Sequence, residues 1–166
     1  MIKINNVLVA TDFGTASESA LNYGRELARS FGARLHLLHV VENALLWAGV
    51  DTGGVDLTML QAQLQESARD KLRSLLSDED RRDLRAVTAI RTDNNPAFAI
   101  VAYAKSENMD LIIMGTHGRS AMAHLLMGSV TEKVVRIAPC PVLTVRNPEH
   151  EFVLPDALEH VTAASR

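Results

Sequence analysis

Short apolar runs alternate with helical patterns along almost the whole chain, and this alternation limits the fold more than any other feature. The first run, at residues 7–11, is continuously apolar, as expected for a strand buried on both faces. The runs occupy residues 7–11, 35–41, 84–90, 110–114 and 142–145, with helical patterns at 15–31, 57–76, 96–107 and 129–137. Strands joined through helices form a parallel sheet covered on both sides. We therefore expect a single-domain α/β fold with a five-stranded parallel sheet and helices on both faces.

Composition narrows the class of protein without specifying a chemistry. A chain of 166 residues with 47% hydrophobic and 22% charged residues is long enough to bury one core. A net charge of −3 and an aromatic content of 4% argue against a nucleic-acid partner, which needs a basic stripe or stacking platforms. No apolar run reaches the length of a membrane span, and the first residues do not resemble a secretion signal. The single cysteine, Cys140, fits a reducing compartment, so we expect a cytoplasmic protein with no membrane partner.

Three glycines surround the junction between the fourth strand pattern and the last helical pattern. Gly115 and Gly118 follow the apolar run, and Gly128 comes directly before Ser129 at the expected start of a helix. Glycine allows a sharp turn and the close approach of a ligand, while a helix start presents unpaired N–H groups and the positive end of its dipole. The spacing therefore predicts a phosphate-binding loop. It is not a P-loop, since Gly-Lys-Ser/Thr is absent, nor the G-x-G-x-x-G of dinucleotide folds.

Ser129 itself has two interpretations. Its hydroxyl could donate to a phosphate oxygen. Alternatively, Ser129 and Glu132 have the spacing of a capping box, in which two side chains satisfy a helix start without any ligand. The local sequence favours the cap, whereas the complete glycine spacing favours the phosphate site.

The spacing Gly-x2-Gly-x9-Gly-Ser resembles the nucleotide-binding branch of the universal stress protein family. Three further segments resemble the same family in the same order: VLVATDF at 7–13 as its first strand and acidic turn, 37–41 as its second strand and 139–145 as its last. The resemblance covers nearly the whole chain. It implies the strand order 3-2-1-4-5 and a division into a nucleotide-binding domain, residues 1–146, and a C-terminal extension, residues 147–166.

The resemblance also implies that the cofactor is ATP, with or without Mg²⁺. Ligands of open parallel sheets bind beyond the carboxyl ends of the strands, and the family pattern places adenine near Val40, ribose near Asp12 and the phosphates over the glycines. The residues expected to contact the nucleotide are Ala10, Thr11, Asp12, Val40, Met114, Gly115, His117, Gly118, Arg119, Gly128, Ser129, Val130 and Thr131.

Several of these residues have equally ordinary structural explanations. Asp12 could hold a ribose hydroxyl or a hydrated Mg²⁺, or it could form an Asx turn before the first helix. Ala10 and Val40 could form a wall for adenine or simply belong to the core. Arg119 could reach a terminal phosphate or be a solvated loop residue. No metal site is expected, because the histidines lack ligand spacing, and Cys140 between two prolines is more typical of a small buried hydrophobe than of a nucleophile.

These features favour a regulatory protein over an enzyme. No base is paired with a nucleophile, and the HIGH and SGGxD-type loops of related ATP-using enzymes are absent from the sequence. We expect a nucleotide-dependent switch in stress response, with slow or no ATP hydrolysis, that acts on an unknown regulated protein. Two alternatives stay open. One is a protein-interaction dimer without nucleotide binding, and the other is a sensor of AMP or cyclic AMP, since the loop indicates phosphate but not how many.

The last strand pattern, residues 141–145, is expected at an edge of the sheet. A bare apolar edge invites pairing with a second copy, and the family resemblance implies a homodimer through this strand. Residues 42–56 are either a lid or packing for the helix that follows. The turn at 93–96 reads Asp-Asn-Asn-Pro where the family often has glycine, a small residue and proline, a departure that bears on where the third strand ends.

Overall fold

The computed structural model describes residues 2–47, 54, 56–116 and 128–146. At its centre is a five-stranded sheet with the order β3-β2-β1-β4-β5, in which all neighbouring strands run parallel. The strands are β1 Asn6–Ala10, β2 Arg34–Val41, β3 Val87–Thr92, β4 Leu111–Gly115 and β5 Val142–Val145. The predicted number, direction and order of the strands are confirmed.

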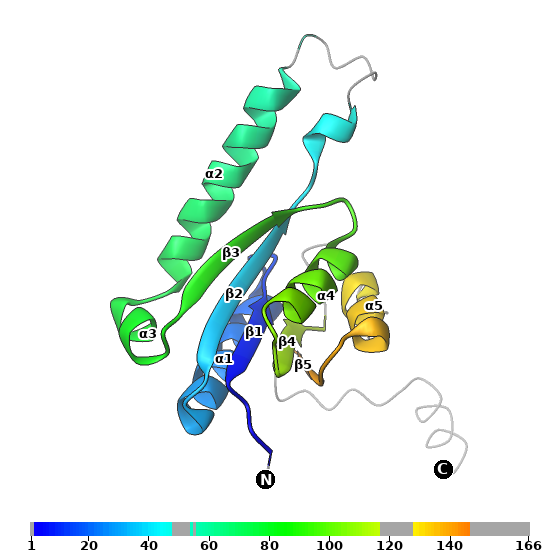
Figure 1. Cartoon of the computed structure of the whole chain (residues 1–166). Helices are drawn as coiled ribbons and strands as arrows, with labels where there is room; N and C mark the ends of the chain where they lie inside the picture. The colour runs from blue at the N-terminus through cyan, green and yellow to red at the C-terminus, as the bar shows by residue number, and fades with distance from the viewer. Residues whose placement is uncertain (1, 48–53, 55, 117–127, 147–166) are drawn as a thin grey trace, which may run out of the picture.

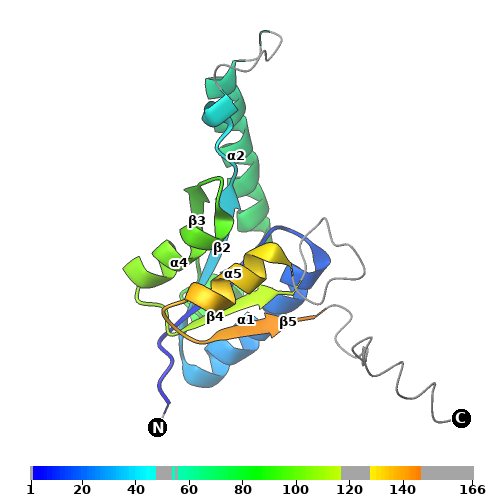
Figure 2. The same cartoon turned by 90° about the vertical axis from the view of Figure 1, so that its right-hand side faces the viewer.

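Helices cover both faces of this sheet (Figures 1 and 2). They are α1 Thr15–Phe31, α2 Leu57–Leu75, α4 Pro96–Ser106 and α5 Ser129–Ile137, with two short helices, η1 Ala44–Trp47 and α3 Asp78–Asp83, on either side of α2. The helices α1 and α2 pack on one face, and α4 and α5 pack on the other. Both views show η1 and the first turns of α2 extending beyond the carboxyl ends of the strands.

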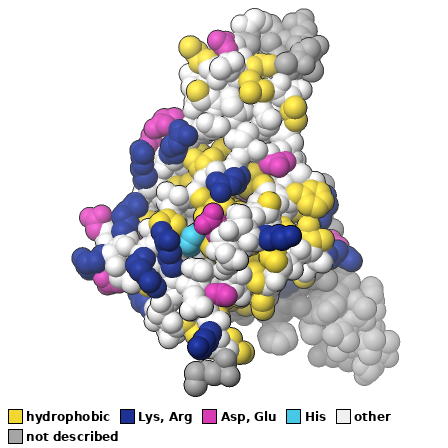
Figure 3. Space-filling model, in the orientation of Figure 1, with side chains coloured by type: hydrophobic (Ala, Val, Ile, Leu, Met, Phe, Trp, Pro, Cys, Tyr) yellow, Lys and Arg dark blue, Asp and Glu magenta, His cyan; other side chains and the backbone are white. Residues whose placement is uncertain are grey.

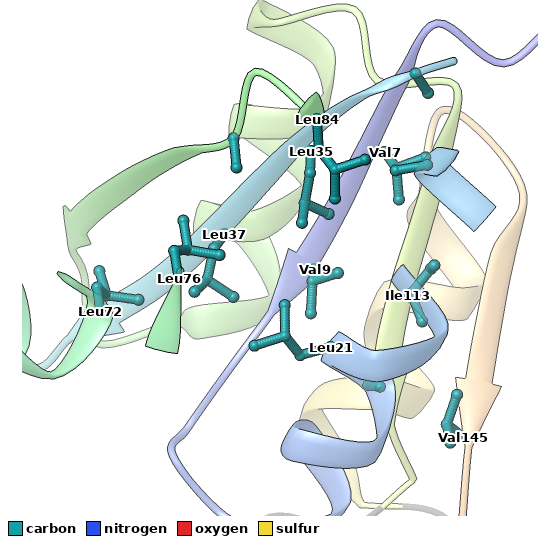
Figure 4. Packing of buried hydrophobic residues seen from close by; sticks show 14 residues of the cluster. Val7, Val9, Leu21, Leu35, Leu37, Leu72, Leu76, Leu84, Ile113 and Val145 are labelled. Atoms are coloured by element: carbon teal, nitrogen blue, oxygen red, sulfur yellow. The ribbon is translucent and has the colours of Figure 1, made fainter. Parts of the chain in front are cut away.

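The strand β1 is apolar from Val7 to Ala10 because both of its faces are covered. Successive side chains of a strand point to opposite faces. Val7 and Val9 of β1 pack beneath α1 and α2 (Figure 4), whereas Leu8 between them packs beneath α4 and α5. All three side chains are 0% exposed. The continuous apolar run of β1 therefore reflects burial on both faces of the strand, as the sequence predicts.

The short helix α3 is a feature that the sequence analysis missed. Its first residues form a capping box: the Ser77 hydroxyl accepts the N–H of Asp80, and the Asp80 carboxylate accepts the N–H of Ser77. Serine followed three residues later by an acid is a recognised helix start. The sequence pattern predicts no helix between the helical pattern that ends at residue 76 and the strand pattern that begins at residue 84.

The predicted bounds of the third strand are wrong. The strand β3 spans Val87–Thr92 rather than 84–90, because α3 and a left-handed residue, Arg85 with φ of 50°, come first. In α1, the side chain of Phe31 is 45% exposed. Phe31 is the last residue of the helix, directly before the left-handed turn at Gly32, so it lies past the sheet that the helix covers.

The amino ends of the strands are closed by a network of ionic and hydrogen bonds. Asp80, only 2% exposed, accepts from Arg25 Nε at 3.0 Å, and Arg29 Nη2 lies 3.6 Å away. Burial alone would raise the pKa of Asp80, but the Ser77 N–H and the Arg25 guanidinium hold this pKa below its ordinary value. On the neighbouring strands, Asp110 accepts the N–H groups of two residues at the start of β1.

The surface drawn in Figure 3 carries Lys and Arg side chains interspersed with Asp and Glu side chains. Four ion pairs join residues three or four positions apart on the same helix. Such pairs contribute little individually. No helix in the described part of the chain combines the length and apolarity that crossing a bilayer requires.

Candidate functional site

Predicted contact residues from three strands lie at the carboxyl ends of the sheet. Ala10 is paired with Met114 across β1 and β4 and with Leu38 across β1 and β2, and Val40 lies two residues beyond Leu38 on the same face. Ala10, Met114 and Val40 all belong to the apolar cluster beneath α4 and α5. Ala10 and Met114 lie on either side of the point where the strand order reverses, between β1 and β4, which is where open α/β sheets bind ligands, and Val40 lies on the next strand, β2.

Helix α5 begins beside this apolar cluster, at the end of β4. Gly128 is the N-cap with φ of −67° and ψ of 150°, and no side chain caps the helix. Ser129 is therefore the first helical residue rather than the cap, and Glu132 bonds Arg136 at 2.8 Å instead of reaching back. The capping-box alternative for Ser129 is wrong.

The start of α5 leaves backbone donors without partners among the described residues. The N–H of Glu132 reaches the Gly128 carbonyl, but no acceptor is present in this part of the chain for the amides of Ser129, Val130 and Thr131. Unpaired amides at a helix start and the positive end of the dipole together favour an anion. Ser129 itself is exposed and Val130 half-buried.

Two hydrogen bonds fix this helix start against β4. The Thr131 hydroxyl donates to the Gly115 carbonyl at 2.8 Å, and the Gly128 N–H donates to the Thr116 carbonyl at 2.6 Å. The Gly128 amide is therefore committed within the protein and is not a free donor for a ligand. Thr131, predicted as a contact residue, is 5% exposed and anchors the helix through its side chain.

Gly115 lies between the starts of two helices. A Cβ atom at this position would come within 2.8 Å of the backbone carbon and the Cβ of Ala16, in the first turn of α1. Its carbonyl accepts from Thr131 in the first turn of α5. A glycine is needed here by packing alone, and this packing brings the positive ends of two helix dipoles to the end of one strand.

Three of the four helices that begin at or beyond the carboxyl ends of the strands lack a side-chain cap among the described residues. The N-caps of α1, α4 and α5 are Gly14, Asn95 and Gly128, and none of them makes a side-chain capping hydrogen bond. By contrast, Asp56 caps α2 and Ser77 caps α3 through their side chains. With glycine as the N-cap, as in α1 and α5, a helix start forgoes a few tenths of a kcal/mol relative to a side-chain cap. The lack of caps is thus concentrated at the edge where the predicted contact residues meet.

The acidic turn after β1 is held by its own hydrogen bonds. Asp12 Oδ1 accepts the N–H of Gly14 at 3.0 Å, so the Asx turn considered from the sequence is formed. This hydrogen bond orients the Asp12 carboxylate within the turn. Thr11 is 7% exposed, and its hydroxyl accepts the Phe13 N–H and lies 2.9 Å from the Ser17 hydroxyl. Thr11 therefore supports the turn from beneath.

The remaining predicted contacts, His117, Gly118 and Arg119, lie outside the described residues, and their roles stay predictions. Among the described residues no three metal-ligating side chains gather. Cys140 is half-buried, and burial, followed by the charge of Asp110, raises the pKa of its thiol. A thiol that stays protonated is a poor nucleophile.

The first part of the 42–56 segment packs on α2. The Ala44 N–H donates to Gln61 Oε1 at 2.7 Å, and Ala44 is 1% exposed, whereas the neighbouring Leu46 is 67% exposed. This supports packing over a lid for η1. The tail at 147–166 and most of 48–55 lie outside the described residues.

Sequence reasoning missed one pair of residues at this edge, His39 and Phe13. Their rings lie 4.3 Å apart, and His39 Nδ1 is 2.7 Å from the Thr11 carbonyl. The signal was present only in part: an aromatic residue between Asp12 and Gly14 in a tight turn, and a polar residue in an apolar strand.

Comparison with known proteins places this fold in a family. Residues 3–146 match the universal stress protein family. Universal stress protein YxiE from Bacillus subtilis is 32% identical over 146 residues, which are 86% of this chain and 99% of that protein. The structure of universal stress protein UspA from Lactobacillus plantarum superposes with a TM-score of 0.74 at 26% identity, covering 88% of this chain and 100% of that one.

A universal stress protein from Archaeoglobus fulgidus, determined in complex with dAMP, has the same architecture. It superposes with a TM-score of 0.53 at 20% identity, covering 87% of this chain and 98% of that one. At this identity the likeness extends to the fold alone.

Proposed function

The chain belongs to the universal stress protein family, and from this premise and the carboxyl-edge geometry we propose that it binds an adenine nucleotide, ATP in particular, as a regulatory switch. The observation that carries the proposal is the start of α5, where the amides of Ser129, Val130 and Thr131 have no acceptor among the described residues. A phosphate group would supply those acceptors and would meet the positive end of the dipole.

The residues at this edge fit the three parts of the nucleotide. The phosphates would lie over the start of α5, next to Gly115, with the exposed Ser129 hydroxyl as a further donor. The base would lie against the apolar surface of Ala10, Met114 and Val40, with the Val40 backbone reading its edge. Contact with an apolar surface favours an aromatic ring, while the amides favour anionic oxygen.

The ribose would lie between these two ends, at Asp12. The carboxylate of Asp12 is set at the carboxyl end of β1 by its bond to the Gly14 N–H. Carboxylate oxygens accept hydrogen bonds from hydroxyl groups, and they also bind Mg²⁺ through its waters. A single such acid suits the magnesium ion that accompanies ATP phosphates. The loop residues His117, Gly118 and Arg119, which are assigned from the sequence alone, would complete the phosphate contacts.

We propose regulation rather than turnover because the described edge offers binding groups without a reactive pair. The hydroxyl pair of Thr11 and Ser17 is buried, and Ser17 donates onward to the Gly14 carbonyl, so neither is set as a nucleophile beside a base. Bound ATP would contribute charge and a switchable γ-phosphate. Hydrolysis should be slow or absent, and the regulated protein would read the bound state, in stress response and in the cytoplasm.

The outer edge of β5 supports the proposed homodimer. In the described part of the chain β5 pairs only with β4, and its residues Val142, Leu143 and Thr144 are half-buried. A second copy pairing through residues 141–145 would cover this edge. Sedimentation at micromolar concentration should give the mass of a dimer, and a monomer would contradict this part of the proposal.

The nucleotide is tested by extraction followed by titration. Protein purified without added nucleotide is treated with acid, and any released compound is identified by its mass. The stripped protein is then titrated with ATP, ADP, AMP and cyclic AMP. ATP binding most tightly, with little hydrolysis over hours, is the expected result. A preference for a monophosphate would replace the ATP switch with an AMP or cyclic-AMP sensor, and no binding at millimolar concentration would leave a protein-interaction dimer.

A further inference from the structure

The residue after Asp12 has an unusual backbone conformation. Phe13 has φ of 65°, in the left-handed region that residues with a side chain rarely adopt. Such outliers persist only where their surroundings hold them in place, and they concentrate at functional sites. The contacts that hold Phe13 in this conformation also determine the position of the preceding residue, Asp12.

One side chain from the neighbouring strand reaches both neighbours of Asp12. His39, near the end of β2, has its ring centroid 4.3 Å from that of Phe13, with the ring planes tilted by 37°. Its Nδ1 atom lies 2.7 Å from the carbonyl oxygen of Thr11. A carbonyl oxygen only accepts, so the proton is on Nδ1 and His39 donates this hydrogen bond.

Two other contacts also hold Phe13 in place. The Phe13 N–H donates to the Thr11 hydroxyl at 3.0 Å, and Lys71 Nζ from α2 lies 5.5 Å from the centroid of the Phe13 ring. With Thr11 and Phe13 both fixed, the backbone of Asp12 has little freedom, and its carboxylate is aimed by the bond to Gly14.

We infer that His39 is a positioning residue: through the Thr11 carbonyl and the Phe13 ring it holds the Asp12 carboxylate where it selects nucleotides that carry ribose hydroxyls. The inference rests on the proposed function, since it assigns Asp12 to the ribose. The position of His39 in β2 supports it. His39 points toward the side of α1 and α2, and the next residue, Val40, points toward the proposed base surface, so one strand end would set both contacts.

Three variants separate this role from ordinary packing. His39→Leu removes both the hydrogen bond and the aromatic contact. His39→Asn keeps an N–H donor close to the position of Nδ1 and serves as the conservative rescue. The matched control is His36→Phe, on the same strand: His36 is 4% exposed, bonds the Tyr103 hydroxyl at 2.8 Å and belongs to the opposite face of the sheet.

The readout is the ratio of dissociation constants for 2′,3′-dideoxy-ATP and ATP, measured by calorimetric titration. Losing hydrogen bonds to a carboxylate should weaken binding about tenfold, so the unmodified protein should show a ratio of that size. His39→Leu should bring the ratio close to one, His39→Asn should restore most of it, and His36→Phe should leave it unchanged. A full ratio in His39→Leu would overturn the inference.

A second measurement needs no nucleotide. The amides of Phe13 and Gly14 are bonded to Thr11 Oγ1 and Asp12 Oδ1, so their hydrogen exchange reports whether the turn is held. Both should lose protection in His39→Leu and keep it in His36→Phe. Unchanged protection in His39→Leu would overturn the positioning role whatever the protein binds.

The two measurements also separate this inference from the proposed function. A protein that binds no nucleotide would sink the proposed function and the ribose selection with it, while the exchange data would still decide whether His39 holds the turn. A protein that binds ATP without preferring it over the dideoxy form would overturn the inference and leave nucleotide binding in place.

Discussion

The two ends of the sheet are built from the same strands and helices, yet they differ in how the backbone polar groups at the helix ends are satisfied. At the amino ends, helices terminate and their last carbonyls meet cations: Arg85 donates to the Gly32 carbonyl after α1, and Arg81 donates to the Leu76 carbonyl after α2. At the carboxyl ends, α1, α4 and α5 begin without side-chain caps.

This difference is consistent with the proposal that the carboxyl end binds a ligand, while the polar groups of the amino end are satisfied within the protein. Cations beside helix C-termini and carboxylates that accept backbone amides are stabilising within the protein itself. Uncapped helix starts give up that stabilisation unless something outside the described residues supplies acceptors. If the amino end serves stability and the carboxyl end binds the proposed nucleotide, substitutions at the two ends should separate the two properties.

The largest effect is expected from Asp80→Ala at the amino end. It removes the carboxylate that accepts the Ser77 N–H in the α3 capping box and leaves Arg25 without its buried partner, so the free energy of unfolding should fall by about 3 kcal/mol. Urea denaturation measures the loss. Asp83→Ala, which removes an exposed pair with Arg82, is the control and should change the stability by less than about 0.5 kcal/mol. Asp80→Ala should still bind ATP with unchanged affinity when fully folded; weakened binding would break the division between the two ends.

Gly115→Ala is the next largest and should affect both properties. The added methyl group would collide with the backbone of Ala16, where nothing can rotate away, so about 2 kcal/mol of stability should be lost. Because the collision pushes β4 away from α1, ATP affinity should fall as well. Thermal unfolding and titration on the same sample measure the two effects. A variant as stable as the parent would show that the two helix starts are not packed on Gly115.

Gly128→Asp would give α5 a side-chain cap at its start, like the cap that α3 has at the amino end of the sheet. The backbone of Gly128 is in an extended conformation open to any residue, and aspartate is a favourable N-cap. Stability should stay the same or rise by a few tenths of a kcal/mol, while ATP affinity should fall, since the new carboxylate competes with phosphate for the amides and repels it. Unimpaired ATP binding would argue against a phosphate at this helix start.

The smallest expected effect is on the pH dependence of stability, and it comes from His36 in β2, between the two ends of the sheet. Burial lowers the pKa of His36, Arg34 lowers it further and Glu107 opposes the shift. The unfolded state thus binds a proton more readily than the folded state. The contribution of His36 to stability is complete above its ordinary pKa of 6.5 and is lost progressively as the pH falls below that value. His36→Phe should flatten the decline of the melting temperature over this range, and an equally steep decline would exclude His36 as its source.

The fold was predictable because burial on two faces produces a continuous run of apolar residues in a strand, which can be recognised in the sequence. The continuous run from Val7 to Val9 could not be a half-exposed strand, and its alternation with helices required parallel pairing. The order of the strands came only from the family resemblance. The α3 helix was missed although its Ser77 and Asp80 have capping-box spacing, because a six-residue helix leaves no apolar period to detect.

The candidate site was predictable in its residue types and less so in its donors. That Ala10 and Met114 are neighbours depends on the register of β1 against β4, which the sequence does not contain. Ser129 and Glu132 have capping-box spacing, and only the backbone angles of Gly128 show that the cap lies one residue earlier. His39 was overlooked because its contacts with Thr11 and Phe13 run between strands and depend on a left-handed turn.

The most direct test of a phosphate at the start of α5 is ATP titration of Ser129→Pro beside Ser129→Ala. Proline is tolerated at the first helical position, where Ser129 stands, and the extended backbone of Gly128 suits the residue before a proline. The substitution therefore removes one amide donor and leaves the helix in place. We predict that Ser129→Pro binds ATP about tenfold more weakly than Ser129→Ala, with the same melting temperature. Equal affinities would show that this amide does not hold the nucleotide and would contradict the proposed site.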